Sequence, residues 1–115
     1  MTITDATLFD LAPLVTPDYT ELTLPERYAA FRAANPQVLD AFEATAAEWL
    51  NAGHARVGMK AVAERIRWET GVHMGESGWK VNNSFVAFIA RDLLHRRPEW
   101  RGRIETRTQK CEATR

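Results

Sequence analysis

Cysteine is nearly absent from the sequence, since Cys111 is the only one among 115 residues and the chain cannot form an internal disulfide. Long hydrophobic runs are absent as well: no stretch reaches 18 apolar residues, and the first residues lack the basic and apolar segments of a secretory leader. These absences argue against a membrane span and against secretion, so we expect a cytoplasmic protein. A single domain of this length buries about two thirds of the surface that its unfolded chain exposes, and it needs no disulfide or structural metal to fold.

Catalytic and metal-binding motifs are also missing. The sequence contains no HExxH, CxxC, GxSxG or glycine-rich phosphate loop, and His54, His73 and His95 lie far apart. Cys111 stands close to the end of the chain, away from every histidine. We therefore expect a protein that is not an enzyme and that needs no cofactor and no metal.

The chain also has no net charge, because 15 Lys and Arg balance 15 Asp and Glu. The distribution is nevertheless uneven. Residues 1–53 contain eight acidic and two basic residues, a net charge of −6, whereas residues 54–115 contain thirteen basic and seven acidic residues, a net charge of +6. Such asymmetry is typical of a chain whose basic half faces a polyanion, although a solvated surface with no partner has the same counts.

The first 22 residues differ in character from the rest. We expect an extended N-terminal arm over 1–22, because prolines interrupt apolar residues that follow no helical or strand period. Its apolar content predicts packing on its own domain or on a partner. Thr7-Leu8-Phe9 also resembles, loosely, the peptides that dock on a bacterial sliding clamp. Residues 23–108 are the predicted single domain, and residues 109–115 a flexible tail.

Hydrophobic periodicity predicts four helices in this domain. A capping box of Thr23 and Glu26 begins the first helix, and Asn35-Pro36 separates it from the second, with Asn35 as the N-cap. The third helix has a basic outer face. The four predicted buried stripes are Leu24, Tyr28 and Phe31; Val38, Leu39, Phe42, Ala46, Trp49 and Leu50; Met59, Val62, Ala63 and Ile66; and Val81, Phe85, Phe88, Ile89 and Leu93.

Three of the six glycines fall within residues 71–81. This pattern predicts a hairpin or an ordered loop, with Trp68 and Trp79 holding it in place. Residues 103–108 alternate polar and β-branched residues around Ile104 and predict a short strand. The predicted fold class is mainly α: a small helical bundle with a helix-turn-helix of winged or elaborated type and a short β-hairpin or strand.

The last two predicted helices have the order of a helix-turn-helix module, in which the second, 83–97, is the recognition helix. Its connection, residues 71–82, is longer than the turn of the standard module, which favours an elaborated variant. Asn is well shaped to pair with adenine in the major groove and Arg with guanine, while a small Ala allows close approach. In the alternative interpretation Asn82 and Asn83 only cap the helix. The candidate base-contact residues are Asn82, Asn83, Ser84, Ala87 and Arg91.

Basic residues cluster after this helix and are interleaved with Trp100. Lys and Arg in such a stretch suit phosphates, whose contacts position a protein on DNA without reading its sequence. An Arg-rich region that only keeps the protein soluble is the alternative. The candidate phosphate-contact residues are Lys80, Arg96, Arg97, Arg101, Arg103 and Arg107.

Five short segments carry a resemblance to known proteins. They are Phe31-Arg32-Ala33-Ala34-Asn35-Pro36, Glu64-Arg65-Ile66-Arg67-Trp68, Lys80-Val81-Asn82-Asn83, Ala90-Arg91 and Glu105-Thr106-Arg107. With these segments, about two thirds of the chain resembles a group of small proteins of actinobacteria and their bacteriophages, of the helix-turn-helix DNA-binding type. The resemblance implies a phage or prophage origin and a DNA-binding role, and it brings no established activity.

We therefore expect a non-catalytic protein that binds duplex DNA, as a small regulator or accessory factor of a phage or bacterium. A homodimer is expected with it, because palindromic operators need two copies. The alternative is a phage-encoded protein-interaction module that binds and modulates a host protein, with the basic half docking on an acidic surface. In a third interpretation the acidic half of one copy meets the basic half of the next, which gives an electrostatically assembled oligomer.

Overall fold

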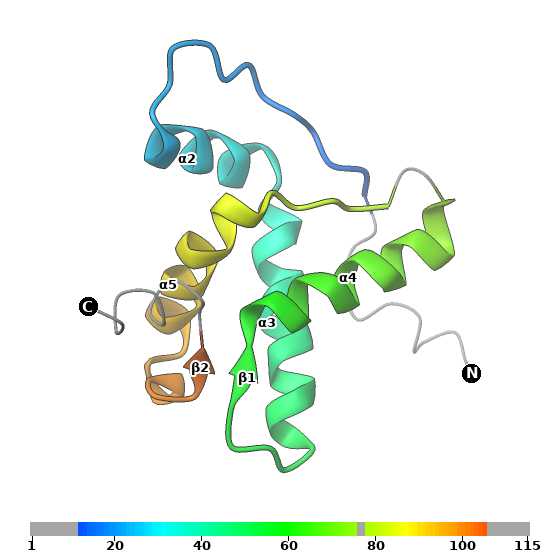
Figure 1. Cartoon of the computed structure of the whole chain (residues 1–115), viewed down its shortest axis with the longest axis vertical. Helices are drawn as coiled ribbons and strands as arrows, with labels where there is room; N and C mark the ends of the chain where they lie inside the picture. Colours follow the sequence, from blue (N-terminus) through cyan, green and yellow to red (C-terminus); the bar gives the residue numbers. More distant parts are fainter. Residues whose placement is uncertain (1–11, 76–77, 106–115) are drawn as a thin grey trace.

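The computed structural model of the chain describes residues 12–75 and 78–105, which are mainly helical (Figure 1). Within these residues, no helix has the length and apolar character that crossing a membrane requires. The elements in chain order are α2 (Leu24–Ala34), α3 (Pro36–Asn51), β1 (Val57–Gly58), α4 (Met59–Met74), the short 3₁₀ helix η2 (Asn83–Phe85), α5 (Val86–Arg96), the short 3₁₀ helix η3 (Pro98–Trp100) and β2 (Ile104–Glu105).

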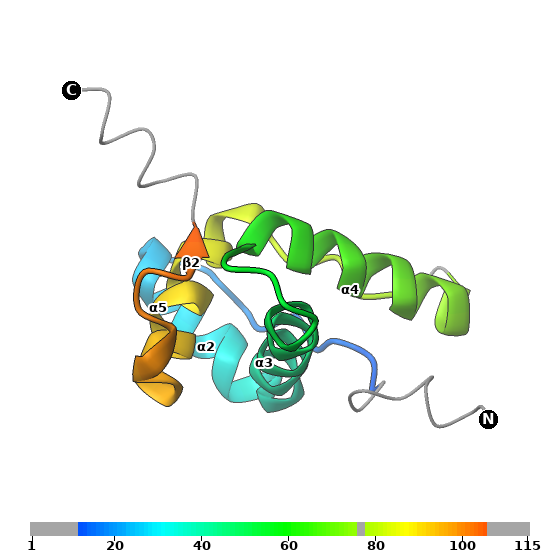
Figure 2. The same cartoon turned by 90° about the horizontal axis from the view of Figure 1, so that it is seen from below.

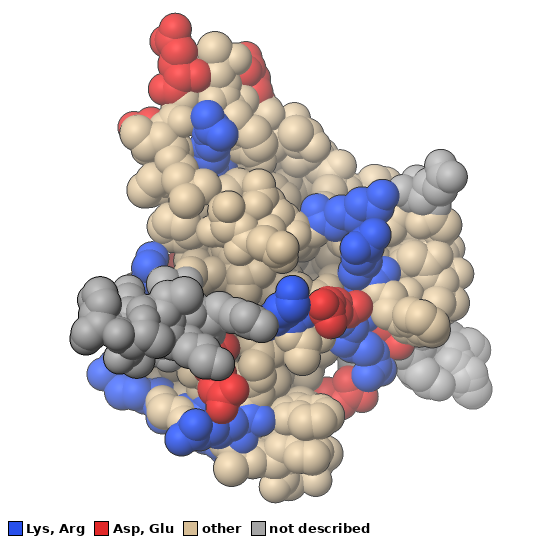
Figure 3. All heavy atoms as spheres, viewed as in Figure 1, with Lys and Arg blue, Asp and Glu red and all other residues tan. Residues whose placement is uncertain are grey.

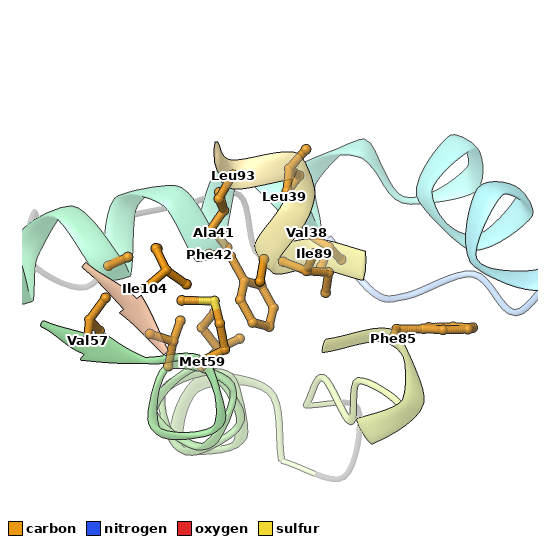
Figure 4. Close-up of a cluster of buried hydrophobic side chains, with 14 of the residues drawn as sticks. Val38, Leu39, Ala41, Phe42, Val57, Met59, Phe85, Ile89, Leu93 and Ile104 are labelled. Atoms are coloured by element: carbon orange, nitrogen blue, oxygen red, sulfur yellow. The ribbon is translucent and has the colours of Figure 1, made fainter. Parts of the chain in front are cut away.

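α3 is the central helix of the bundle. In Figure 2, which looks along α3, α4 lies on one side and α2 and α5 lie on the other. α4 and α5 pack against α3 and against each other. Figure 4 shows the interior that results, where the Met59 side chain of α4 lies beside the Phe42 ring of α3 and Ile89 reaches in from α5. All three side chains are buried, so the core sits between these helices.

α2 begins where the sequence predicts. Thr23 Oγ1 accepts a hydrogen bond from the Glu26 backbone N–H at 3.3 Å, and Glu26 Oε1 accepts one from the Thr23 N–H at 2.9 Å, which completes the capping box. Tyr28 and Phe31 are buried as predicted. Leu24, at the first helical position, is exposed, so the buried stripe of α2 is one turn shorter than predicted.

Asn35 is fully buried and joins the N-terminal arm to the helices. Its Oδ1 accepts a hydrogen bond from the Val15 N–H at 2.7 Å, and its Nδ2 donates to the carbonyls of Val15 at 2.8 Å and Phe31 at 3.0 Å. These bonds use the side-chain amide, so the predicted side-chain cap of α3 is not formed. Trp79 Nε1 donates to the Ala12 carbonyl at 2.8 Å. The described part of the arm therefore packs on its own domain.

The two short strands form a parallel pair. Val57 of β1 pairs with Ile104 of β2, and Gly58 pairs with Glu105. Of the predicted strand 103–108, the structure describes residues 103–105: Ile104 and Glu105 form β2, whereas Arg103 lies in the turn before it. The partner strand follows α3 and lies outside the glycine-rich segment. The pair connects the turn after α3 to the last described part of the chain.

The prediction of a hairpin at residues 71–81 is wrong for the residues that the structure describes there. α4 continues through Gly71 to Met74, and Gly75, with a φ of 65°, ends it. The connection to η2 is therefore residues 75–82, which is shorter than predicted. The prediction failed because glycine content alone does not distinguish a glycine inside a helix from a glycine in a turn.

The chain returns from Gly75 along the helix that it has just left. A Cβ built at Gly78 would lie 2.9 Å from the Cα of Gly71, closer than side-chain carbons come to backbone, so position 78 requires glycine. A Cβ built at Gly71 would meet nothing within 4 Å. The Trp79 N–H donates to Thr70 Oγ1 at 2.8 Å, and Thr70 Oγ1 donates to the Ile66 carbonyl at 2.9 Å. The return segment is thereby bonded to α4.

Two tryptophans occupy other places than the sequence predicts. Trp49 is 48% exposed at the edge of α3, where its ring stacks on His54 at 3.8 Å, rather than in the core. Trp68 is 70% exposed and does not hold the glycine-rich segment, because α4 continues past it as a helix with this side chain on its outer face. Trp79 is fully buried and does hold that segment, as predicted.

Candidate nucleic-acid interface

The predicted recognition helix begins with a single turn of 3₁₀ helix. Asn82 Oδ1 accepts a hydrogen bond from the Ser84 N–H at 2.7 Å, which starts η2, and α5 follows from Val86. Pro98 opens η3 two residues after α5 ends at Arg96. A helical segment therefore covers Asn83–Arg96, close to the predicted range 83–97. The capping role of Asn82 is confirmed.

Aromatic rings fix the start of this segment on α2. Phe85 is buried, with its ring centroid 5.6 Å from that of Tyr28 and 5.1 Å from that of Phe31. The Phe88 ring stacks on the Tyr28 ring with a centroid distance of 5.1 Å. These contacts determine which face of α5 packs on α2, because Phe85 and Phe88 both lie on that face.

A carboxylate makes the second connection to α2. Asp92 accepts hydrogen bonds from the Tyr28 hydroxyl and, at 2.8 Å, from the Arg32 guanidinium. Burial raises the pKa of the Tyr28 phenol, and the hydrogen bond to Asp92 raises it further. The hydrogen bond to the same carboxylate raises the pKa of Arg32. Both donors therefore keep their protons at neutral pH, and α5 stays attached to α2.

The candidate base-contact residues lie between the start of η2 and the middle of α5. Asn82, Asn83, Ser84 and Arg91 are exposed and Ala87 is half-buried. The Arg91 guanidinium lies over the Phe88 ring, 5.0 Å from its centroid, and has no ion partner among the described residues. Asn83 likewise makes no side-chain hydrogen bond within the part of the chain that the structure describes. Asn82, Asn83 and Ser84 lie at the start of η2, Ala87 in the first turn of α5 and Arg91 in the middle of α5.

Two of the candidate phosphate contacts are bonded to the acidic face of α3. Arg96 donates to Asp40 at 2.9 Å and to Glu43 at 2.7 Å, and Arg97 donates to Glu43 at 2.8 Å. The hydrogen bonds from Arg96 and then Arg97 lower the pKa of Glu43, and Glu43 raises the pKa of both arginines. The acidic and basic halves of the chain therefore meet inside one molecule.

The other candidate phosphate contacts differ in whether they are bonded within the fold. Arg103 donates to the carbonyls of Ala55 and His54, both at 3.0 Å, and so holds the turn after α3. Lys80 and Arg101 are exposed and have no ion pair with any described residue. Arg107 lies outside the described residues.

α4 contributes basic side chains that the predicted set of phosphate contacts did not include. Figure 3 shows Lys and Arg side chains gathered where α4 and the segment leading into α5 run side by side, with Asp and Glu between some of them. On α4, Lys60 and Arg65 form ion pairs within the helix, whereas Arg67 is exposed and forms none with the described residues. The predicted basic outer face of this helix was the signal that could have identified Arg67.

Comparisons with protein-family models, with curated proteins and with solved structures find no match for this chain. The resemblance to small helix-turn-helix proteins of actinobacteria and their phages therefore stays a prediction. The residues themselves carry the functional argument.

Proposed function

We propose that this protein is a non-catalytic DNA-binding factor, a small regulator or accessory protein of a phage or bacterium, that presents the start of α5 to duplex DNA. In this proposal α4, the connection 75–82 and α5 act as an elaborated helix-turn-helix. Two copies would bind a palindromic site.

One observation carries the proposal: the basic side chains separate into two groups. Arg96, Arg97 and Arg103 are bonded within the chain, whereas Lys80 and Arg91 are exposed without an ion partner among the described residues. Lys80 precedes η2 and Arg91 lies in the middle of α5, and the exposed amide and hydroxyl side chains of Asn82, Asn83 and Ser84 come between them in the chain. A Lys or Arg side chain that is already paired with a carboxylate must break that pair before it binds phosphate. The second group has no such pair to break, so its side chains can bind DNA phosphates at a lower cost in free energy.

The proposal assigns a role to each free side chain. Asn83 and Arg91 read base edges, since their amide and guanidinium groups match adenine and guanine in the major groove. Ala87 allows the helix to approach closely. Lys80 and Arg101, with Arg67 of α4, bind phosphates. Arg96, Arg97 and Arg103 leave the predicted phosphate-contact set and act in the stability of the fold.

A titration of labelled duplex DNA at two salt concentrations tests the proposal. Each phosphate that a Lys or Arg neutralises steepens the fall of log K with log salt by about 0.9. Lys80, Arg101 and Arg67 together predict a slope of about −3 for each copy that binds. Fluorescence anisotropy measures the slope. Absence of binding at low salt would overturn the proposal.

Variants separate base reading from phosphate binding. Asn83→Ala combined with Arg91→Ala should weaken binding to a selected site by about 3 kcal/mol and leave non-specific binding almost unchanged. Lys80→Gln should weaken all sequences alike. Trp68→Ser is the control, because Trp68 is exposed on α4 and carries no charge. An equal loss on specific and non-specific DNA in the double variant would contradict the assignment of base contacts.

A second function, binding to a host protein, is favoured by a different observation. Trp68 is 70% exposed and Val72 is 64% exposed, one turn apart on α4. Exposed tryptophan beside an aliphatic residue is typical of protein interfaces. A chain that binds no DNA at low salt but crosslinks to a host protein through a photoreactive residue at position 68 would support this alternative.

A further inference from the structure

A pocket of about 440 Å³, here the α3–α4 pocket, lies between the last turns of α3, the turn that follows, β1 and the first half of α4. Its uncharged lining includes buried Thr45, Val57 and Val62, exposed Ala61 and the half-exposed ring of Trp49. None of the residues proposed to contact DNA lines it. Sites of this volume hold drug-sized molecules, which are larger than one indole ring.

The wall of the pocket that follows α3 is held in place without any occupant. The Trp49 ring stacks on His54 with 3.8 Å between the ring centroids, and Trp49 Nε1 donates to the Arg56 carbonyl at 2.8 Å. Arg103 donates to the carbonyls of His54 and Ala55. Because stacking and hydrogen bonds both hold this turn, the pocket has the character of a preformed binding site.

The arginines of the lining already have carboxylate partners. Arg56 is paired with Glu105 at 3.2 Å and Arg65 with Glu69 at 3.1 Å. A further lining residue, Glu48, is acidic and would repel an anion. The lining therefore favours an occupant that is apolar and carries no charge.

An aromatic side chain without cover lies on the same helix as the rim of the pocket. Trp68 is 70% exposed and Val72 is 64% exposed. The half of α4 that carries them extends away from α3 and α5, as Figures 1 and 2 show. Two helical turns separate Ala61 from Trp68, so both residues lie on one face of α4, about 10 Å apart.

Two copies of the chain can cover both features at once. A contact between identical copies related by a twofold axis is made twice, once in each direction. When this axis passes midway between Ala61 and Trp68, it places Trp68 of each copy at the α3–α4 pocket of the other. One symmetric contact therefore covers both tryptophans and fills both pockets.

The area available suits a weak dimer. Two tryptophan side chains of this exposure can bury about 300 Å² between them. The pocket walls bury a similar area, and Val72 with the side chains around it brings the total to about 1,000 Å², the size at which specific interfaces begin. Because the chain has no net charge, no long-range repulsion opposes the association of two copies.

We propose that the protein forms a symmetric homodimer in which Trp68 of each copy inserts into the α3–α4 pocket of the other. The indole ring lies against Val57, Ala61 and Val62, and Val72 extends the apolar contact along α4. The dimer forms from the chain alone and does not rest on DNA binding. Its small interface predicts a dissociation constant of about 100 µM.

Sedimentation of the full chain without DNA, from about 10 µM to about 1 mM, tests the dimer. Since the contact is apolar, the dissociation constant should change less than about twofold between about 0.1 and 1 M NaCl. A dimer that dissociates as salt rises would indicate that the acidic half of one copy meets the basic half of the other, and would contradict insertion of Trp68. A chain that stays monomeric throughout would overturn the proposal and leave Trp68 to a host protein.

Three variants test the two sides of the contact. Trp68→Ser removes the inserting ring and Ala61→Trp fills the pocket, so both should stay monomeric at about 1 mM although each keeps the other half of the contact. Leu24→Ser is the matched control, because Leu24 is apolar and 42% exposed but lies on α2 and does not line the pocket. It should dimerise like the wild type. Cooperative melting shows that each variant is folded, and a dimer of unchanged strength in Ala61→Trp would contradict the role of the pocket.

A photoreactive residue at position 68 maps where this side chain lies in the dimer. Irradiation at about 300 µM should give a covalent dimer, and mass spectrometry should find the crosslinks in residues 45–62 of the other copy. Crosslinks confined to residues 67–73 of the other copy would mean that the exposed ends of two α4 helices meet without using the pocket, and would overturn the insertion.

The dimer and the DNA surface fail or succeed separately. Lys80→Gln, which should weaken DNA binding, should dimerise like the wild type, whereas Trp68→Ser should stay monomeric and keep its non-specific DNA binding. A chain that dimerises as stated but binds no DNA would support the pocket contact and overturn the DNA proposal alone.

Discussion

The side-chain amide of Asn35 satisfies both backbone groups of one residue in the arm, the N–H and the carbonyl of Val15, in the way that a neighbouring strand would. A second donor hydrogen serves the Phe31 carbonyl at the end of α2. The attachment of the arm at this point therefore depends on one side chain with both a donor and an acceptor.

Replacing Asn35 should be costly. Asn35→Ala removes three hydrogen bonds of a fully buried side-chain amide, and we expect it to lower the free energy of unfolding by about 3 kcal/mol. Urea denaturation followed by circular dichroism measures the change. Asn51→Ala, at the exposed end of α3, is the matched control and should change stability by less than about 0.5 kcal/mol. Equal effects of the two substitutions would contradict the role of Asn35.

Single residues also show where the sequence stops being informative. The acidic outer face of α3 and the arginines after α5 are both visible in the sequence, but their pairing joins Glu43 to Arg96 and Arg97 across more than fifty positions. Charge patterns report local periodicity and carry no information on which face meets which. The sequence therefore predicts phosphates as partners of Arg96 and Arg97, and it does not show that both are bonded to Glu43 within the fold.

Among the elements, α4 and the segment that returns along it depend on a contact between glycines. Gly78→Ala would place a Cβ 2.9 Å from backbone atoms of Gly71, which cannot move without disturbing the helix. We expect a loss of about 2 kcal/mol in stability. Gly58→Ala is the matched control, since a Cβ there meets nothing within 4 Å. Thermal unfolding of the two variants should differ clearly, and similar melting temperatures would contradict this account.

Helices and turns differed in how well the sequence predicted them. The helices α2, α3 and α5 follow from apolar spacing and from capping residues such as Thr23 and Asn82, because both signals act within a few positions. β1 has two residues and pairs with a segment far along the chain, so it leaves no periodic pattern. The pocket lined by Thr45, Val57 and Val62 leaves no pattern in the sequence for the same reason, because its walls come from α3, β1 and α4.

For the whole molecule, part of the opposite charge of the two halves is paired inside the fold, where Arg96 and Arg97 bond to Asp40 and Glu43. The pKa of Glu43 is held below its ordinary value of 4.5 by the hydrogen bonds from Arg96 and Arg97. A carboxyl group with a lowered pKa stabilises the folded state fully above the unfolded pKa. This contribution is lost as the pH falls through the lowered pKa of the folded state.

Acid should therefore destabilise the wild type more than a variant without this carboxylate. We expect the melting temperature to fall between neutral pH and about pH 3 by more in the wild type than in Glu43→Gln. Differential scanning fluorimetry measures both curves. Glu48→Gln, on the same helix and without an ion pair among the described residues, should follow the wild type. A Glu43→Gln curve parallel to that of the wild type would contradict the contribution of the pair.

The parallel pair of β1 and β2 also has a consequence for the order of folding. Val57 meets Ile104, so every residue of α4 and α5 lies within the loop that this pair closes. On the ribosome, α2, α3 and α4 can form from neighbouring contacts while β1 still waits for a partner that has not been synthesised. Closing a loop of this length costs entropy that helix formation does not. The strand pair is therefore expected to complete the fold after the helices have docked, as its last step.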